Sequence, residues 1–99
     1  MAALTIVYWR DIPAQVIVKK GRTSAKRELA LRFTEAIDMA AMRTGAAETD
    51  AYLAEWRRGD PVEVSDDLEK EADDAVARID AEYGKERIVA LVKNGGRDG

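Results

Sequence analysis

The sequence predicts a small α+β domain in which helices cover one face of a β-sheet. β-branched and aromatic residues dominate the first 20 positions, apolar residues then recur at helical spacing, and Gly or Pro separates the segments. A chain of 99 residues buries a single core, and 46% hydrophobic with 35% charged residues is typical of a globular protein. We expect the order β-β-α-α-β-α, one domain over residues 1–96 and a loose tail at 97–99.

The predicted hairpin joins the segments Leu4–Trp9 and Ala14–Lys20 through a connection that contains Pro13. An odd number of connecting residues keeps the apolar side chains of both strands on one face, whereas an even number mixes them with a lysine. Since a slip of one residue exchanges the two faces, we prefer the odd connection. It places Trp9 and Gln15 on the face opposite the predicted core.

A first helix is expected from Ala25 to about Arg43, because apolar residues recur there every three or four positions. The preceding Gly21–Ser24 breaks the second strand and offers N-cap residues. A short helix from Thr49 to about Arg57 and a proline-led edge strand at Pro61–Val64 follow.

The last helix is predicted to open at Ser65 and to run through about Tyr83, where Gly84 interrupts it. A final short helix is expected around Ile88–Val92. The predicted helical stripes pack on the hairpin, with Leu29, Phe33, Ile37, Leu68, Val76 and Ile79 set against Ile6, Val16 and Val18.

Composition excludes several classes of chemistry. The chain has no cysteine and no histidine, which removes disulfides, thiolate catalysis and the commonest metal ligand, so no metal and no cofactor is expected. The net charge of −3 makes nucleic acid an improbable partner. The sequence contains no apolar run long enough to cross a bilayer and no signal peptide, so we expect a cytoplasmic protein with no membrane association.

Two basic clusters are weak candidates for binding an anion. The first surrounds the predicted helix N-terminus after Gly21, where free N–H groups and the helix dipole favour negative charge. The second follows Trp56. Their candidate residues are Arg22, Ser24, Lys26, Arg27, Arg57 and Arg58. A solvated basic face is the favoured alternative, and a solvated helix face is likewise favoured for the acidic run between Asp66 and Asp74.

The stretch from Trp9 to Gln15 is the stronger candidate, as a partner-binding surface. Its proposed contact residues are Trp9, Arg10, Asp11, Pro13 and Gln15. Aromatic residues and arginine are enriched at binding hot spots, and loops on a rigid scaffold commonly carry binding residues. The alternative, weighted about equally, is that Trp9 packs under a helix and that Arg10 and Asp11 form an exposed ion pair.

The string Val7-Tyr8-Trp9-Arg10-Asp11-Ile12-Pro13-Ala14-Gln15-Val16, continued by Tyr52-Leu53-Ala54-Glu55-Trp56-Arg57-Arg58-Gly59, resembles a known family. It is similar to the small bacterial "virulence factor" family, whose module is also found in conserved virulence factor C. The resemblance covers nearly all of residues 4–93. It implies no established substrate, cofactor or catalytic residue. Some relatives are joined to a domain like those of iron–sulfur scaffold proteins, and a chain without cysteine serves such a process only as a partner.

We therefore expect a non-catalytic protein-binding or adaptor module, monomeric or weakly dimeric, with its contact surface around the hairpin. No nucleophile–base pair stands out, so no catalytic residue is assigned. The alternatives are a protein that binds a small anion, or an enzyme that uses Asp11 with Arg10.

Overall fold

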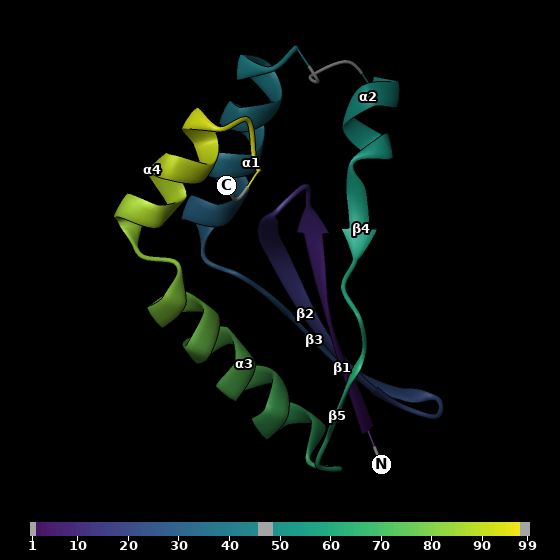
Figure 1. Cartoon of the computed structure of the whole chain (residues 1–99). Helices are drawn as coiled ribbons and strands as arrows, with labels where there is room; N and C mark the ends of the chain where they lie inside the picture. The colour runs from purple at the N-terminus through teal and green to yellow at the C-terminus, as the bar shows by residue number, and fades with distance from the viewer. Residues whose placement is uncertain (1, 46–48, 98–99) are drawn as a thin grey trace.

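The computed structural model describes residues 2–45 and 49–97. Within them the chain forms five strands and four helices (Figure 1). The strands are β1 Ala2–Trp9, β2 Ile12–Lys20, β3 Thr23–Glu28, β4 Trp56–Arg58 and β5 Val62–Val64. The helices are α1 Leu31–Arg43, α2 Thr49–Ala54, α3 Leu68–Glu82 and α4 Lys85–Lys93. The protein is thus an α+β fold, as predicted, with the fuller order β-β-β-α-α-β-β-α-α.

The sheet is antiparallel with β1 near its centre. Its order is β3-β2-β1-β4, and β5 pairs with the other half of the same β1 edge. β4 pairs with residues 7–9 of β1 and β5 with residues 2–4. Between them, the Gly59 N–H donates to the carbonyl oxygen of Ile6 over 2.8 Å, so the short connection follows the edge. The first strand therefore has partners on both sides along most of its length.

The expected helix start at Ala25 is wrong, because residues 23–28 form the third strand. Of these six residues only Ala25 is buried, and it pairs with Val18 of β2. Arg27 turns towards α3 and forms ion pairs with Glu69 and Asp73. The helical spacing that begins at Leu29 is real, but the helix itself begins at Leu31. Gly21–Ser24 is consequently a hairpin turn and a strand start, with no helix N-terminus.

The expected short helix through Arg57 is also shorter than predicted. It ends at Ala54, and residues 56–58 extend to form β4. Pairing with β1 gives the backbone N–H and C=O groups of these residues hydrogen-bond partners. The predicted strand at 61–64 is present as β5, and Asp67 rather than Ser65 caps α3 by accepting a hydrogen bond from the backbone N–H of Lys70.

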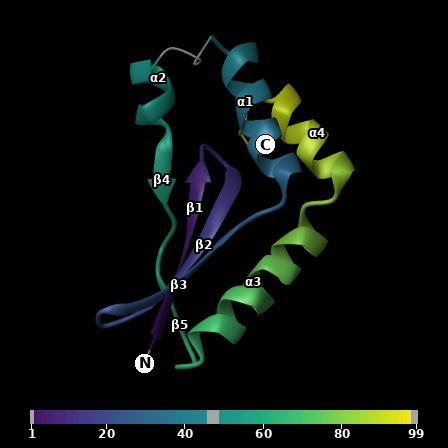
Figure 2. The same cartoon turned by 180° about the vertical axis from the view of Figure 1, so that it is seen from behind.

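The core lies between the sheet and the helices. Leu29, Phe33, Ile37 and Ile79 are buried with Val16 and Val18, and Ile6, Leu68 and Val76 pack on them, as the apolar stripes predict. α3 packs on β2 and β3, while α1 and α4 pack together beyond the tip of the β1–β2 hairpin. α2 lies across that tip from α1 and α4 (Figures 1 and 2). In the part of the chain described here, no helix is long and apolar enough to cross a membrane.

The hairpin contains a β-bulge that decides which side chains enter the core. Leu4 pairs with Val18 and Ile6 with Val16, as the odd connection predicts. The register then shifts between Val7 and Tyr8, and the last pair is Trp9 with Ile12. The turn therefore has only two residues, Arg10 and Asp11, and the extra residue of the bulge reconciles the two registers.

Candidate functional site

The two segments that carry the sequence resemblance lie side by side as β1 and β4. Trp9 pairs with Trp56, Tyr8 with Arg57 and Val7 with Arg58. Because successive side chains of a strand point to opposite faces, this pairing divides the segments into two sets. The tryptophans lie on one side of the sheet, and Tyr8 with Arg57 lies on the other.

Trp9 is fully buried, with 0% of its surface exposed. Trp9 lies on the predicted side of the sheet, with Val7, but it is buried there, as the alternative that it packs under a helix predicts. The indole Nε1 donates to the carbonyl oxygen of Tyr52 over 2.9 Å, and the Tyr52 ring lies 5.8 Å from the Trp9 ring. α2 thus covers this end of the sheet, which the sequence pattern left open. Partial burial of Tyr52 raises the pKa of its hydroxyl, and the negative charge of Asp38 raises this pKa further.

Arg10 also serves the fold. Its backbone lies in the left-handed region at φ 55°, and its N–H donates to the carbonyl oxygen of Glu55 over 3.1 Å. Its guanidinium lies 4.8 Å from the Trp9 ring centroid, donates through Nη1 to the carbonyl oxygen of Gly95, and places Nε 3.3 Å from the Glu55 carboxylate. These contacts tie the hairpin turn to both α2 and the C-terminal segment.

On the other side of the turn, Arg57 organises an accessible cluster. Its Nε donates to the carbonyl oxygen of Arg10 over 3.0 Å, and its Nη2 donates to a carboxylate oxygen of Asp11 over 3.1 Å. Its guanidinium carbon lies 4.5 Å from the centre of the Tyr8 ring. An arginine held at two points over an aromatic ring is a preorganised surface, because little side-chain freedom remains to be lost on binding.

This cluster borders a groove along the β1 edge, which we call the edge groove. It consists of two cavities of about 350 and 460 Å³ that share Tyr8, Gly59 and Asp60. The smaller cavity lies between α3 and β5, and the larger one reaches towards the hairpin turn. The remaining lining residues are Leu4, Ile6, Val62, Val64, Glu71, Asp74, Ala75 and Arg78 in the smaller cavity, and Asp11, Arg57 and Tyr83 in the larger.

Gly59 keeps the edge groove narrow at its centre. A Cβ at this position would lie 3.0 Å from the Cε2 atom of Tyr8 and 3.3 Å from the carbonyl oxygen of Ile6. Any larger residue would push the connection away from β1 or displace the Tyr8 ring. Close packing against Tyr8 and Ile6 therefore explains why a glycine stands at position 59, directly after Arg57 and Arg58.

The edge groove combines an apolar floor with a net negative rim. Leu4, Ile6 and Ala75 contribute apolar surface from β1 and α3. Four carboxylates, those of Asp11, Asp60, Glu71 and Asp74, line it against the two guanidinium groups of Arg57 and Arg78. Since Arg57 is paired with Asp11, the remaining charge is that of three carboxylates and one guanidinium group.

The predicted partner-binding residues are not brought together on one surface. Trp9 and Pro13 are buried, and Arg10 is turned to the C-terminal segment. Asp11 borders the edge groove. Gln15 lies on the opposite face of the sheet, beside a hollow of about 560 Å³ that Val7 and Trp56 also line.

The predicted anion-binding residues are also dispersed. Arg22 and Ser24 belong to the β2–β3 hairpin, where the predicted helix N-terminus does not exist. Arg27 is held by two carboxylates of α3, and Arg57 by Asp11. Lys26 and Arg58 lie on the sheet face that points away from α3. Because residues 23–28 form a strand, no helix dipole acts at the first basic cluster.

Tyr8, Gly59, Asp60 and the α3 residues that face them were not among the site residues predicted from the sequence. One signal was present in the chain: Tyr8 and Gly59 both lie inside the two segments that carry the resemblance. No local pattern relates α3 to that edge, however. Among the described residues, no group of three or more His, Cys, Asp or Glu side chains is arranged to hold a metal ion.

Comparison with known proteins gives one finding about ancestry. A family model described as "Virulence factor" matches residues 7–92, which includes both segments and most of the chain. No curated protein and no solved structure matches the chain.

Proposed function

The chain belongs to the virulence factor family, and from this premise we propose that it is a non-catalytic protein-binding module whose edge groove takes an extended segment of a partner protein. The observation that carries the proposal is that four partly or fully exposed residues of the two family segments, Tyr8, Asp11, Arg57 and Gly59, line this one groove. Gln15 and Arg58 of those segments lie on the opposite face of the sheet, whereas Trp9, Arg10 and Pro13 serve the fold.

The dimensions of the edge groove suit a short extended segment. Leu4 and Tyr8, four residues apart on β1, both line it. In a strand that separation is about 14 Å, which corresponds to about four extended residues of a bound peptide. Tyr8 and Arg57 at its centre are residue types that dominate binding energy at protein interfaces.

The charge of the groove selects the partner. Once the Arg57–Asp11 pair is set aside, three carboxylates remain against Arg78. A segment that alternates apolar and basic side chains would place the apolar ones on the Leu4 and Ala75 floor and the basic ones at the rim. Electrostatic complementarity of this kind favours encounter with the correct partner and disfavours acidic segments.

An NMR titration tests the proposal. Short peptides that alternate apolar residues with lysine are titrated into ¹⁵N-labelled protein, with matched peptides that carry glutamate in place of lysine. We expect saturable shifts at the amides of residues 4–8 and 59–64 for the basic peptides only. Asp74→Lys should weaken binding by about tenfold or more, because it replaces an attraction at the rim by a repulsion.

The matched control is Glu35→Lys, which makes the same charge change at an exposed position of α1 outside the groove. It should bind like the wild type. Equal losses in both variants would indicate only an effect of net charge. Shifts centred elsewhere, or no saturable binding by any basic peptide, would contradict the proposed site.

A further inference from the structure

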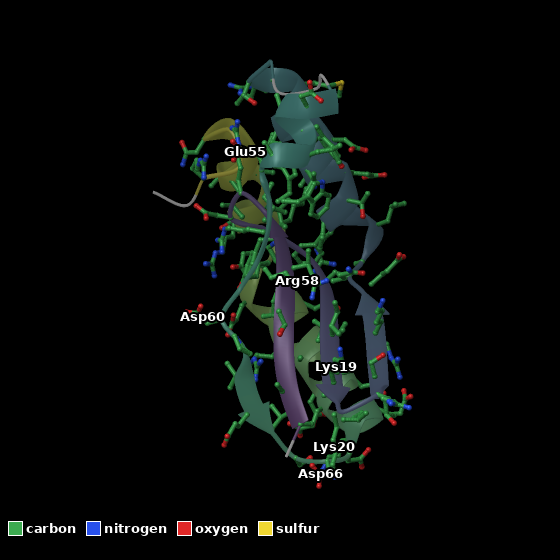
Figure 3. The ribbon with its side chains drawn as sticks, turned by 90° about the vertical axis from the view of Figure 1, so that its right-hand side faces the viewer. Lys19, Lys20, Glu55, Arg58, Asp60 and Asp66 are labelled. Carbon is green, nitrogen blue, oxygen red and sulfur yellow. The ribbon has the colours of Figure 1, made fainter. Side chains whose placement is uncertain are left out.

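The face of the sheet that points away from α3, which we call the open face, carries ordered rows of side chains. Figure 3 looks onto the sheet from this side, with Arg58 and Lys19 labelled over the strands. Cross-strand pairing defines an upper row across β4, β1, β2 and β3, a middle row across β1, β2 and β3, and a lower row across β5, β1, β2 and β3. The rows are Arg58–Val7–Gln15–Glu28, Thr5–Ile17–Lys26 and Glu63–Ala3–Lys19–Ser24.

The charges of the open face are arranged with opposite signs at opposite borders. In the upper row, Arg58 is at the β4 border and Glu28 is at the β3 border. In the lower row, Glu63 is at the β5 border and Ser24 at the β3 border, and Lys26 is at the β3 border of the middle row. None of these four charged side chains forms an ion pair with another residue of 2–45 or 49–97, whereas Arg27 and Arg57 on the other side of the same strands do.

Among the described residues, two apolar side chains at the middle of the open face remain partly exposed. Val7 and Ile17 are half-buried in the centre of the upper and middle rows. Beside Val7 lies the hollow of about 560 Å³, bordered by Trp56 and by Leu31, which leaves 70% of its surface exposed. An apolar centre with charged borders is the usual organisation of a protein interface.

We propose that a second copy of this chain covers the open face, sheet against sheet, about a twofold axis parallel to the strands. Such a rotation places the β3 border of one copy over the β4 and β5 border of the other. Each row stays at the same position along the strands, so it faces the same row of the second copy. Arg58 of each copy then faces Glu28 of the other, and Val7 faces Gln15. The interface is isologous, so each contact occurs twice.

The charge pattern favours a second copy over other partners. An acidic partner would oppose Glu28 and Glu63, and a basic one would oppose Arg58 and Lys26. A partner that complements the upper row must carry both signs in the exchanged order, and the same face of another copy does so with Arg58 and Glu28. Aligned sheets pack about 10 Å apart, a gap that an arginine and a glutamate reaching from opposite sides can close. This surface is separate from the edge groove, so the proposal does not depend on the proposed function.

Sedimentation velocity over a range of protein concentrations tests the proposal. The wild type should show a monomer–dimer equilibrium. Arg58→Glu and Glu28→Arg should each raise the dimer dissociation constant by about tenfold or more, because each change affects two symmetric contacts. The double variant Arg58→Glu/Glu28→Arg restores opposite charges across the axis, and its dissociation constant should return close to that of the wild type. Lys85→Glu, the same change of charge at an exposed position of α4, is the control and should dimerise normally.

Several outcomes would overturn the proposal. These are a wild type that stays monomeric up to about 1 mM, corresponding to an association free energy weaker than about −4 kcal/mol, a dimer that Arg58→Glu leaves unchanged, and a double variant that fails to recover. A measurement on the unmodified protein guards against misfolded variants. In a dimer of labelled and unlabelled chains, isotope-filtered NOEs should connect Ile17 of one copy with Thr5 of the other. A dimer that lacks these NOEs would also refute the arrangement.

Discussion

Gly96→Ala tests whether the C-terminal segment is packed on the central tryptophan. Gly96 has φ 88°, and a Cβ there would lie 3.0 Å from Cζ3 of Trp9 and 3.3 Å from Cδ of Arg10. An alanine forced into the left-handed region costs about 1–2 kcal/mol. Overpacking against a buried ring adds about 1–3 kcal/mol. The total expected loss of unfolding free energy is about 2–5 kcal/mol.

Gly21→Ala supplies the matched control. Gly21 has φ 59°, and no atom would lie within 4 Å of an added Cβ, so only the backbone cost applies. The two variants should therefore differ by about 1–3 kcal/mol. For a domain of this size each kcal/mol corresponds to about 4–8 °C in melting temperature. Urea denaturation and thermal melting, both followed by circular dichroism, measure the difference.

In Gly96→Ala, the C-terminal segment can relieve the clash by moving away from Trp9. This movement limits the loss of unfolding free energy. Leaving breaks the hydrogen bonds from Asp11 N–H to the carbonyl oxygen of Gly96 and from Arg10 Nη1 to that of Gly95. The Trp9 indole would then meet water, and its fluorescence would shift to longer wavelength. If Gly96→Ala and Gly21→Ala lowered stability equally with no change of fluorescence, the packing of this segment on Trp9 would be refuted.

Three further changes probe other parts of the fold. Phe33→Ala removes a fully buried ring and should cost about 3–5 kcal/mol in thermal or chemical unfolding; an unchanged melting temperature would contradict its place in the core. Trp9→Phe removes the donor to the Tyr52 carbonyl and should lower the unfolding free energy by at least about 1–3 kcal/mol, so a neutral result would show that this bond is not formed. The hydrogen bond from Lys20 lowers the pKa of Asp66, so the stabilisation is present above the ordinary carboxyl pKa of about 4 and is lost as pH falls through the folded-state value. Carboxyl ¹³C NMR should find that Lys20→Met raises the pKa of Asp66, and an unchanged titration would exclude the pair.

Periodicity predicted most of the core, because burial repeats along a strand or a helix. The stripes of α1 and α3 and the lower pairs of the hairpin follow directly from it. β3 was missed because an edge strand with Ala25 as its only buried residue lacks an apolar alternation, and because the helical spacing of Leu29 and Phe33 begins directly after its end. β4 was missed for a related reason: three half-exposed or exposed residues form a strand only where β1 offers them partners.

Of the residues that line the edge groove, the sequence reasoning named only Asp11 and Arg57 as candidates. The two family segments do lie together, but their pattern does not reveal the bulge beside Val7, which changes the register before Trp9. Neither does it reveal that α2 and Gly96 cover the indole, since those contacts join residues 43 and 87 positions apart. The edge groove depends on α3 in the same way. Contacts set by tertiary packing leave no period in the local sequence.

The central place of β1 gives the protein a defined order of completion during synthesis. β1, β2 and β3 are consecutive in the chain and can pair as soon as residue 28 is free, whereas β4 and β5 follow only at residues 56–64. At about 5–20 residues per second, the other edge of β1 waits roughly 2–7 seconds for its partners. The cover over Trp9 comes later still, with Gly96. Trp9 therefore remains without its complete cover until Gly96, 87 residues later in the chain, has been synthesised.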